Sequence, residues 1–173
     1  MMKIFLSVLL LLAGYMSFSQ TYISLAPSVT NTAGTLADKS NLALEIGQQW
    51  DVFSLGLDIG QTTLSPIGAK DTGSYLELRP NLNIFQEGKF TNTFTAGIGY
   101  VFGAKNNLLT EVTYGIEYTC TEQMHFNVFF GNYYYSGRTA ATSTSFFGIS
   151  AAYYFKPGKT AALIKREKNN QVN

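Results

Sequence analysis

Charged side chains are scarce in this chain. Asp, Glu, Lys and Arg make up 13% of its 173 residues, whereas a typical soluble domain carries about a quarter. Long apolar runs are missing too, because the run from Ile4 to Ala13 is well short of the roughly 18 residues that a membrane-spanning helix needs. Aromatic residues are abundant at 14%, and glycine is frequent. Together these features favour β structure in a membrane.

Reactive and metal-ligating side chains are also few. Cys120 is the only cysteine and His125 the only histidine, so an intramolecular disulfide is excluded. We find no phosphate-binding glycine loop, no paired metal-ligand spacing and no basic patch suited to nucleic acid. We therefore predict no catalytic residue, no cofactor, no metal and no nucleic-acid partner. His125 is interpreted as a surface or interfacial residue beside Glu122.

The N-terminus has the pattern of a secretory signal peptide. A short basic start precedes the apolar run, and Ser17 and Ser19 stand at the −3 and −1 positions if cleavage precedes Gln20. We predict that residues 1–19 are removed on export. The segment resembles signals common in Bacteroidota. An uncleaved anchor helix is the alternative, which the short apolar core disfavours.

Apolar and polar residues alternate through the rest of the chain. In a strand, successive side chains point to opposite faces, so this period indicates strands with one apolar face. The eight predicted strands are residues 21–29, 41–48, 52–62, 75–84, 93–102, 108–119, 125–135 and 146–155. Each is close to the length that crosses a bilayer on a tilt.

The predicted connections alternate between long and short. Long polar loops are expected at residues 30–40, 63–74 and 136–143, and short links at residues 49–50, 86–89, 103–107 and 121–123. Apart from the link at residues 103–107, which is short where a long loop is expected, this alternation is typical of outer-membrane barrels, and an even strand count places both chain ends on one side of the membrane. Pro27 and Pro80 fall inside predicted strands, and we expect a bulge at Pro80.

The last strand, Phe146–Phe155, resembles the C-terminal strand of bacterial outer-membrane β-barrels, with Gly148, alternating hydrophobic residues and the terminal aromatic Phe155. Residues 21–155 as a pattern resemble the small eight-stranded barrels, such as the OmpA membrane domain and OmpX. The resemblance implies an all-β, eight-stranded antiparallel up-and-down transmembrane β-barrel over residues 20–155. It also implies the cell outer membrane as location, outer-membrane lipids as partners, and recognition of Phe146–Phe155 by the barrel-insertion machinery. A monomer is favoured.

A soluble barrel, such as a lipocalin, would show the same alternation with its faces reversed. The polar face here is rich in Gly, Ser, Thr and Asn, which are small enough to fill a narrow eight-stranded interior. The outer face of a soluble barrel would be richer in Lys and Glu, and aromatic residues gather at the predicted strand ends, as in a membrane girdle. We therefore predict that the apolar face meets lipid.

The lumen is predicted to contain five acidic residues and one cation. This polar network comprises Glu45, Asp58, Glu77, Arg79, Glu111 and Glu117. Buried charges must be paired or neutralised. The network is interpreted as a structural plug, with a proton or cation site as the alternative. If Thr62 faces Tyr75, then Asp58 faces Arg79, and we predict an ion pair between Asp58 and Arg79.

The last 18 residues, 156–173, change in composition and carry five cations against one glutamate. We predict a basic, disordered periplasmic tail. For the whole chain we predict a non-enzymatic outer-membrane barrel with a filled lumen, serving envelope integrity or surface contact through its longer loops. An outer-membrane lipid-modifying enzyme and a secreted soluble barrel that binds an apolar ligand are the alternatives.

Overall fold

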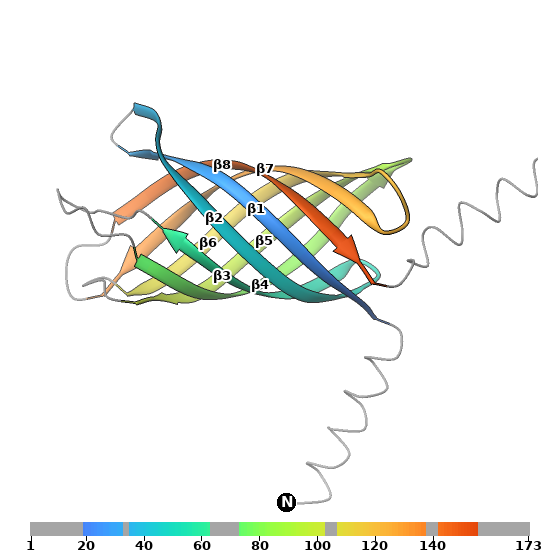
Figure 1. Cartoon of the computed structure of the whole chain (residues 1–173), viewed down its shortest axis with the longest axis horizontal. Helices are drawn as coiled ribbons and strands as arrows, with labels where there is room; N and C mark the ends of the chain where they lie inside the picture. The colour runs from blue at the N-terminus through green and yellow to red at the C-terminus, as the bar shows by residue number, and fades with distance from the viewer. Residues whose placement is uncertain (1–18, 33–34, 63–72, 103–106, 138–141, 156–173) are drawn as a thin grey trace, which may run out of the picture.

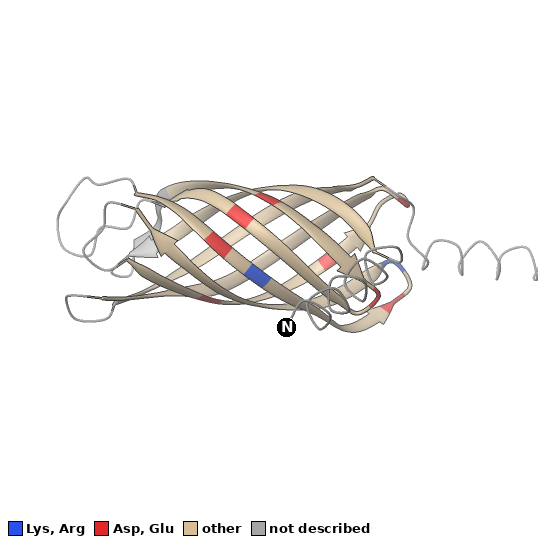
Figure 2. Ribbon diagram, turned by 90° about the horizontal axis from the view of Figure 1, so that it is seen from below, with Lys and Arg blue, Asp and Glu red and all other residues tan. Residues whose placement is uncertain are grey.

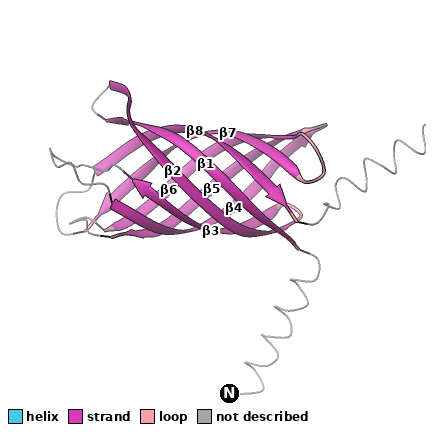
Figure 3. Ribbon diagram, viewed as in Figure 1, coloured by secondary structure: helices cyan, strands magenta, loops and turns pink. Residues whose placement is uncertain are grey.

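The computed structural model describes residues 19–32, 35–62, 73–102, 107–137 and 142–155, and every regular element among them is a strand (Figure 3). No helix within these residues has the length and apolarity to cross a bilayer. The predicted basic tail lies outside the described residues, as does the predicted signal peptide apart from its last residue, Ser19.

The strands form one closed barrel (Figure 1). They are β1 (Gln20–Thr32), β2 (Thr35–Trp50), β3 (Phe53–Thr62), β4 (Gly73–Glu87), β5 (Phe90–Val101), β6 (Leu108–Thr119), β7 (Met124–Ser136) and β8 (Thr142–Tyr154). Each strand pairs antiparallel with the next, and β8 pairs with β1 to close the wall. This confirms the predicted fold class. We call the end that carries Gln20 and Phe155 the turn end, at the right of Figure 1, and the opposite end the loop end.

The alternation of side chains is inverted relative to a soluble barrel. On β5, Ile98 faces outward and is 55% exposed, whereas Thr95 faces the lumen and is 8% exposed. On β6, Val112 and Ile116 face outward while Glu111 and Thr113 are buried. The strands carry few charged residues, most of them acidic (Figure 2). A barrel with an apolar outer belt and a polar interior suits a bilayer. Its strands hydrogen-bond to one another around the whole wall, and its outer side chains are compatible with lipid.

Several predicted connections are wrong, and most of the strands are longer than expected. Within the predicted loop over residues 30–40, residues 30–32 and 35–40 are strand: Thr30 pairs with Lys39 and Thr32 with Thr35, with a register shift between Thr30 and Thr32. Threonine suits a strand, and this hairpin extends past its neighbours at the loop end (Figure 1). Most of the predicted links over residues 63–74, 103–107 and 136–143 lie outside the described residues, and residues 73–74, 136 and 142–143 of these links belong to strands.

One tight turn lies two residues beyond its predicted position, and another is narrower than predicted but lies within the predicted residues 86–89. β2 continues through Trp50, and the turn falls at Asp51 and Val52, where Asp51 has a φ of 51°. β4 continues to Glu87, and the next turn uses Gly88 with a φ of 60°. Asp and Gly are among the residues that tolerate this left-handed conformation, which makes them the natural turn positions.

The two strand prolines interrupt pairing on one side only. Pro27 pairs with Leu42 on β2, but β1 has no rungs with β8 at positions 26 and 27. Pro80 pairs with Leu55 on β3, and the rungs with β5 are missing at positions 79 and 80. The register does not shift at Pro80, so the predicted bulge is wrong; the shift lies between Asn83 and Phe85. Proline removes one donor, which breaks one ladder without displacing the strand.

Bulky lumen side chains stand opposite glycines on neighbouring strands. The directly paired positions are Tyr22 with Gly47, Tyr75 with Gly60, Arg79 with Gly56, Glu77 with Gly99, Glu111 with Gly97, and Phe129 with Gly148. A Cβ at Gly60 would lie 2.5 Å from the Tyr75 ring, and one at Gly148 would lie 2.4 Å from the Phe129 ring. Glycine thus supplies the space that lets a narrow lumen hold large side chains.

We expect Gly99→Ala to destabilise the barrel by about 1–3 kcal/mol, the usual range for overpacking. Its Cβ would lie 2.5 Å from the backbone oxygen of Leu76, which cannot move without displacing the strand. Gly97→Ala should cost less, because the nearest atom is Oε1 of Glu77, the end of a side chain. The free energies of unfolding of the two variants, measured with urea in the same lipid, show which variant loses more stability. Equal losses would contradict this prediction.

Candidate functional site in the barrel lumen

The lumen is closed toward the loop end by apolar and aromatic side chains. We define the aromatic layer as Tyr75, Val101, Leu109, Tyr133, Tyr135 and Phe146, all of which are at most 6% exposed. The Tyr133 and Phe146 rings are stacked with their centroids 4.1 Å apart, and the Tyr75 and Tyr133 ring centroids are 6.4 Å apart. These residues come from β4 to β8, so the layer joins more than half of the wall across the lumen.

A charged network centred on Arg79 lies next to this layer. Arg79 Nη1 is 2.5 Å from Oε2 of Glu45 on β2, and Nη2 is 2.8 Å from Oε1 of Glu111 on β6. The guanidinium therefore bridges two carboxylates on opposite sides of the lumen. Its planar fork suits this double contact better than an ammonium would.

Neutral hydroxyl groups also donate hydrogen bonds to three of the acids. The Tyr22 hydroxyl donates to Glu45, the Thr113 hydroxyl donates to Oε1 of Glu111 at 2.5 Å, and the Tyr75 hydroxyl donates to Asp58 at 2.9 Å. Sequence reasoning missed these donors. Tyrosines on the polar face of a strand, each across from a glycine, were the available signal.

The predicted Asp58–Arg79 ion pair is wrong. The register of β3 with β4 is offset by two residues from the expected one, so Asp58 pairs with Glu77, and Arg79 pairs with Gly56. β4 begins at Gly73, inside the predicted loop. With glycine opposite it, the Arg79 side chain is free to reach Glu45 and Glu111 instead.

A second pair lies toward the turn end. His125 Nδ1 is 2.8 Å from Oε1 of Glu117, and the His125 ring lies 4.4 Å from the Tyr154 ring, centroid to centroid. The Tyr154 hydroxyl donates to Gln49 at 2.8 Å. His125 was interpreted as a surface or interfacial residue beside Glu122, but its partner is Glu117 and its side chain is 17% exposed. His125 shares the lumen face of β7 with Asn127 and Phe129, and its partner is Glu117 on the neighbouring strand.

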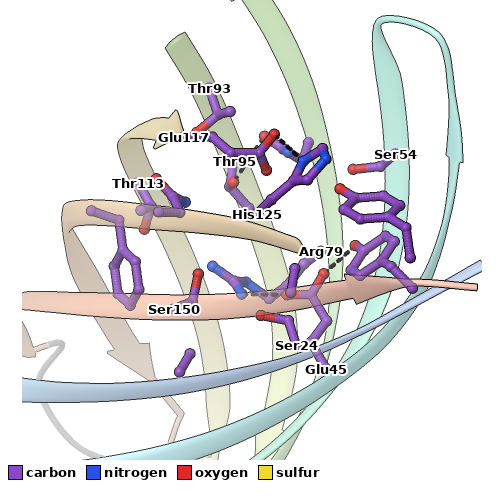
Figure 4. Close-up of a pocket in the computed structure, with 17 residues that line it drawn as sticks. Ser24, Glu45, Ser54, Arg79, Thr93, Thr95, Thr113, Glu117, His125 and Ser150 are labelled. Atoms are coloured by element: carbon purple, nitrogen blue, oxygen red, sulfur yellow. Dashed lines mark hydrogen bonds and ion pairs between the residues drawn. The ribbon is translucent and has the colours of Figure 1, made fainter. Parts of the chain in front are cut away.

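A small polar cavity of about 60 Å³ adjoins both the Arg79 network and the Glu117–His125 pair (Figure 4). Hydroxyl and amide side chains, including Ser24, Thr95 and Asn127, also line it, together with the apolar Ala26, Phe129 and Ala152. A water needs about 10–15 Å³ of such volume and two to four polar partners. The cavity can therefore hold a few waters but no larger ligand.

The structure brings all six predicted network residues to the lumen face, in two groups. Arg79, Glu45 and Glu111 are in direct contact with one another through the guanidinium, whereas Glu117 belongs to the His125 pair. Within the described residues, no three His, Cys, Asp or Glu side chains are grouped to hold a metal. The arrangement is suited to electrostatic cross-linking of the wall rather than to binding a substrate.

No protein-family model matches the chain, and no curated protein matches its sequence. Solved structures do match. Outer membrane protein H (OprH) of P. aeruginosa gives a TM-score of 0.58 at 14% identity, covering 79% of this chain and 99% of that one. The N-terminal β-barrel domain of Pseudomonas aeruginosa OprF gives 0.54 at 13% identity, covering 79% and 98%.

The neisserial surface protein A (NspA) gives a TM-score of 0.55 at 7% identity, covering 78% of this chain and 96% of that one. The fold is that of the small outer-membrane β-barrels. At these identities the likeness concerns the fold. Together with the apolar outer belt, it supports the outer membrane as the location of this barrel.

Proposed function

We propose that this chain is a non-enzymatic outer-membrane barrel that works as a closed, rigid anchor, serving envelope integrity or surface contact at its loop end. One observation carries the proposal: the lumen is crossed by the Arg79 bridge and covered by the aromatic layer. A barrel filled in this way contributes a stable wall and a display surface, and leaves no passage for solutes.

The same proposal sets the orientation of the barrel in the membrane. Residues 1–19 direct export, the turn end faces the periplasm, and the loop end faces the outside. Phe146–Phe155 is the segment recognised by the insertion machinery, although the chain continues beyond Phe155. The β1–β2 hairpin, which extends past the other strands (Figure 1), is the candidate contact surface.

The Glu117–His125 pair gives no support to a lipid-modifying enzyme. A histidine oriented by a carboxylate is part of many catalytic sites, but such a site also needs a nucleophile beside the histidine. The His125 ring packs against the Tyr154 ring, whose hydroxyl donates to Gln49. The pair instead links β6 to β7 near the turn end.

We expect the purified barrel to show no large, long-lived conductance in planar lipid bilayers, because the lumen is filled. Truncating the aromatic layer with Tyr133→Ala and Phe146→Ala together should produce or raise conductance. Phe147→Ala on the outer face, 52% exposed, is the matched control and should leave conductance unchanged. Stable, large channels formed by the unmodified barrel would contradict the proposed closed lumen.

A further inference from the structure

The Arg79 network carries more negative charge than its single cation can balance. Four carboxylates, those of Glu45, Asp58, Glu77 and Glu111, act electrostatically on this one guanidinium. Three of the four accept hydrogen bonds: Glu45 from Arg79 and Tyr22, Glu111 from Arg79 and Thr113, and Asp58 from Tyr75. The fourth, Glu77, differs from the others.

Glu77 is buried without a donor. It is 1% exposed, and no donor among the described residues reaches either of its carboxylate oxygens. The group that it faces within hydrogen-bonding reach is another carboxyl, that of Glu111, whose Oε2 also lacks a donor. Two buried acceptors, each on a residue that is 1% exposed, therefore face each other in the lumen.

The strand between them explains why they meet. Glu77 on β4 and Glu111 on β6 are separated by β5, which presents Gly97 and Gly99 to the lumen. A Cβ at Gly97 would lie 2.1 Å from Oε1 of Glu77 and 3.0 Å from Cβ of Glu111. Without a side chain on β5, the Glu77 carboxyl lies across the wall toward Glu111.

If both carboxyls were ionised, both oxygens of Glu77 and Oε2 of Glu111 would lack donors and the two charges would repel one another, which is costly in a buried site. One proton removes both problems, because a protonated carboxyl becomes a donor to its neighbour. We propose that Glu77 and Glu111 hold a single proton between them, so that the lumen contains a proton-binding site centred on Glu77.

The surroundings place that proton on the Glu77 side. Arg79 Nη2 and the Thr113 hydroxyl both donate to Oε1 of Glu111, whereas neither oxygen of Glu77 has a donor among the described residues. The other groups that face Glu77 are Asp58 on β3, Tyr75 and Arg79 on its own strand, and Tyr133 on β7. Asp58, the residue paired with Glu77, adds further negative charge that favours a neutral Glu77.

Glu77→Gln tests the site, because glutamine is neutral, similar in shape and able to donate to Glu111. In water an unfolded glutamate loses its proton near a pH of about 4.3, so at neutral pH the wild-type barrel must take up close to one proton when it folds into liposomes. Glu77→Gln should take up about one proton fewer. Glu87→Gln, which changes an exposed glutamate on the same strand, is the matched control and should behave as the wild type.

The pH dependence of the free energy of unfolding gives the second readout, because proton binding is linked to folding. A proton bound in the folded barrel and released on unfolding makes the free energy of unfolding fall as the pH rises above the unfolded value. The Glu77→Gln barrel should therefore gain stability relative to the wild type as the pH rises from 5 toward 8. Infrared spectra of the folded wild type should also contain a protonated-carboxyl carbonyl band that Glu77→Gln lacks.

Three results would overturn the site. Equal proton uptake by the wild type and Glu77→Gln would do so, as would the absence of a protonated-carboxyl band from the folded wild type at neutral pH. Stabilisation of the wild type, but not of Glu77→Gln, by Na⁺ or K⁺ at constant ionic strength would replace the proton with a metal cation. If Glu77→Gln fails to insert, the infrared band of the wild type decides alone.

Discussion

Arg79→Gln should destabilise the folded barrel by about 3–5 kcal/mol, the cost of removing one partner from a buried ion pair. The change leaves Glu45 and Glu111 in the lumen without the guanidinium that bridges them. The loss should shrink at acidic pH, where the stranded carboxylates can bind protons. Urea unfolding in lipid, followed by the fluorescence of Trp50, the only tryptophan, measures it.

Two further variants separate the ion pairs from simple packing. The double change of Glu45→Gln with Arg79→Gln should cost less than the sum of the single changes, because the two residues contact each other. Arg79→Lys keeps the charge but loses the planar fork, and should fall between the wild type and Arg79→Gln. Additive single and double effects would show that the Glu45 contact contributes nothing.

Ile98→Arg is expected to cost about 2–4 kcal/mol, the range for a cation on the lipid face near the bilayer midplane. Ile98 lies on the outer face of β5 between Ala96 and Tyr100 and is 55% exposed. The same experiment in a lipid bilayer measures the loss. The expectation depends on this face meeting hydrocarbon, so it tests the orientation of the wall.

Phe102→Arg is the matched control for depth. It places the same charge after the end of the same strand, where Phe102 is 52% exposed and the cost should be about 0–1 kcal/mol. If Ile98→Arg lost no more unfolding free energy than Phe102→Arg, the outer face would meet water at both positions. That outcome would favour the soluble-barrel alternative.

The alternation of apolar and polar residues was sufficient to predict the strands and their faces. Period two depends on nothing beyond the residue types, and Thr95 and Ile98 lie on the predicted sides. Strand ends were harder, because a hairpin such as Thr30–Lys39 beyond the apolar belt needs no hydrophobic pattern to form. Its pairing depends on backbone bonds and turn geometry, which leave little signal in the sequence.

The identity of the lumen residues could be predicted, but their contacts could not. Whether a side chain faces the lumen follows from its odd or even position along the strand. Its partner on the next strand depends instead on the register, and a register offset of two residues leaves every side chain on the same face. That is why Arg79 was placed opposite Asp58, although it pairs with Gly56. The contacts of Arg79 with Glu45 and Glu111 also span non-adjacent strands, which no pairing rule within one hairpin can give.

The glycines opposite the bulky lumen residues set a rule for how this sequence can diverge. A lineage that enlarges Gly60 must shrink Tyr75, and one that enlarges Gly148 must shrink Phe129, because each pair shares one volume. Homologues should therefore exchange the large and small members of a pair together, or transfer them between the two strands. Such paired exchanges would show which residues face each other on neighbouring strands, even in homologues whose overall identity is too low for an alignment.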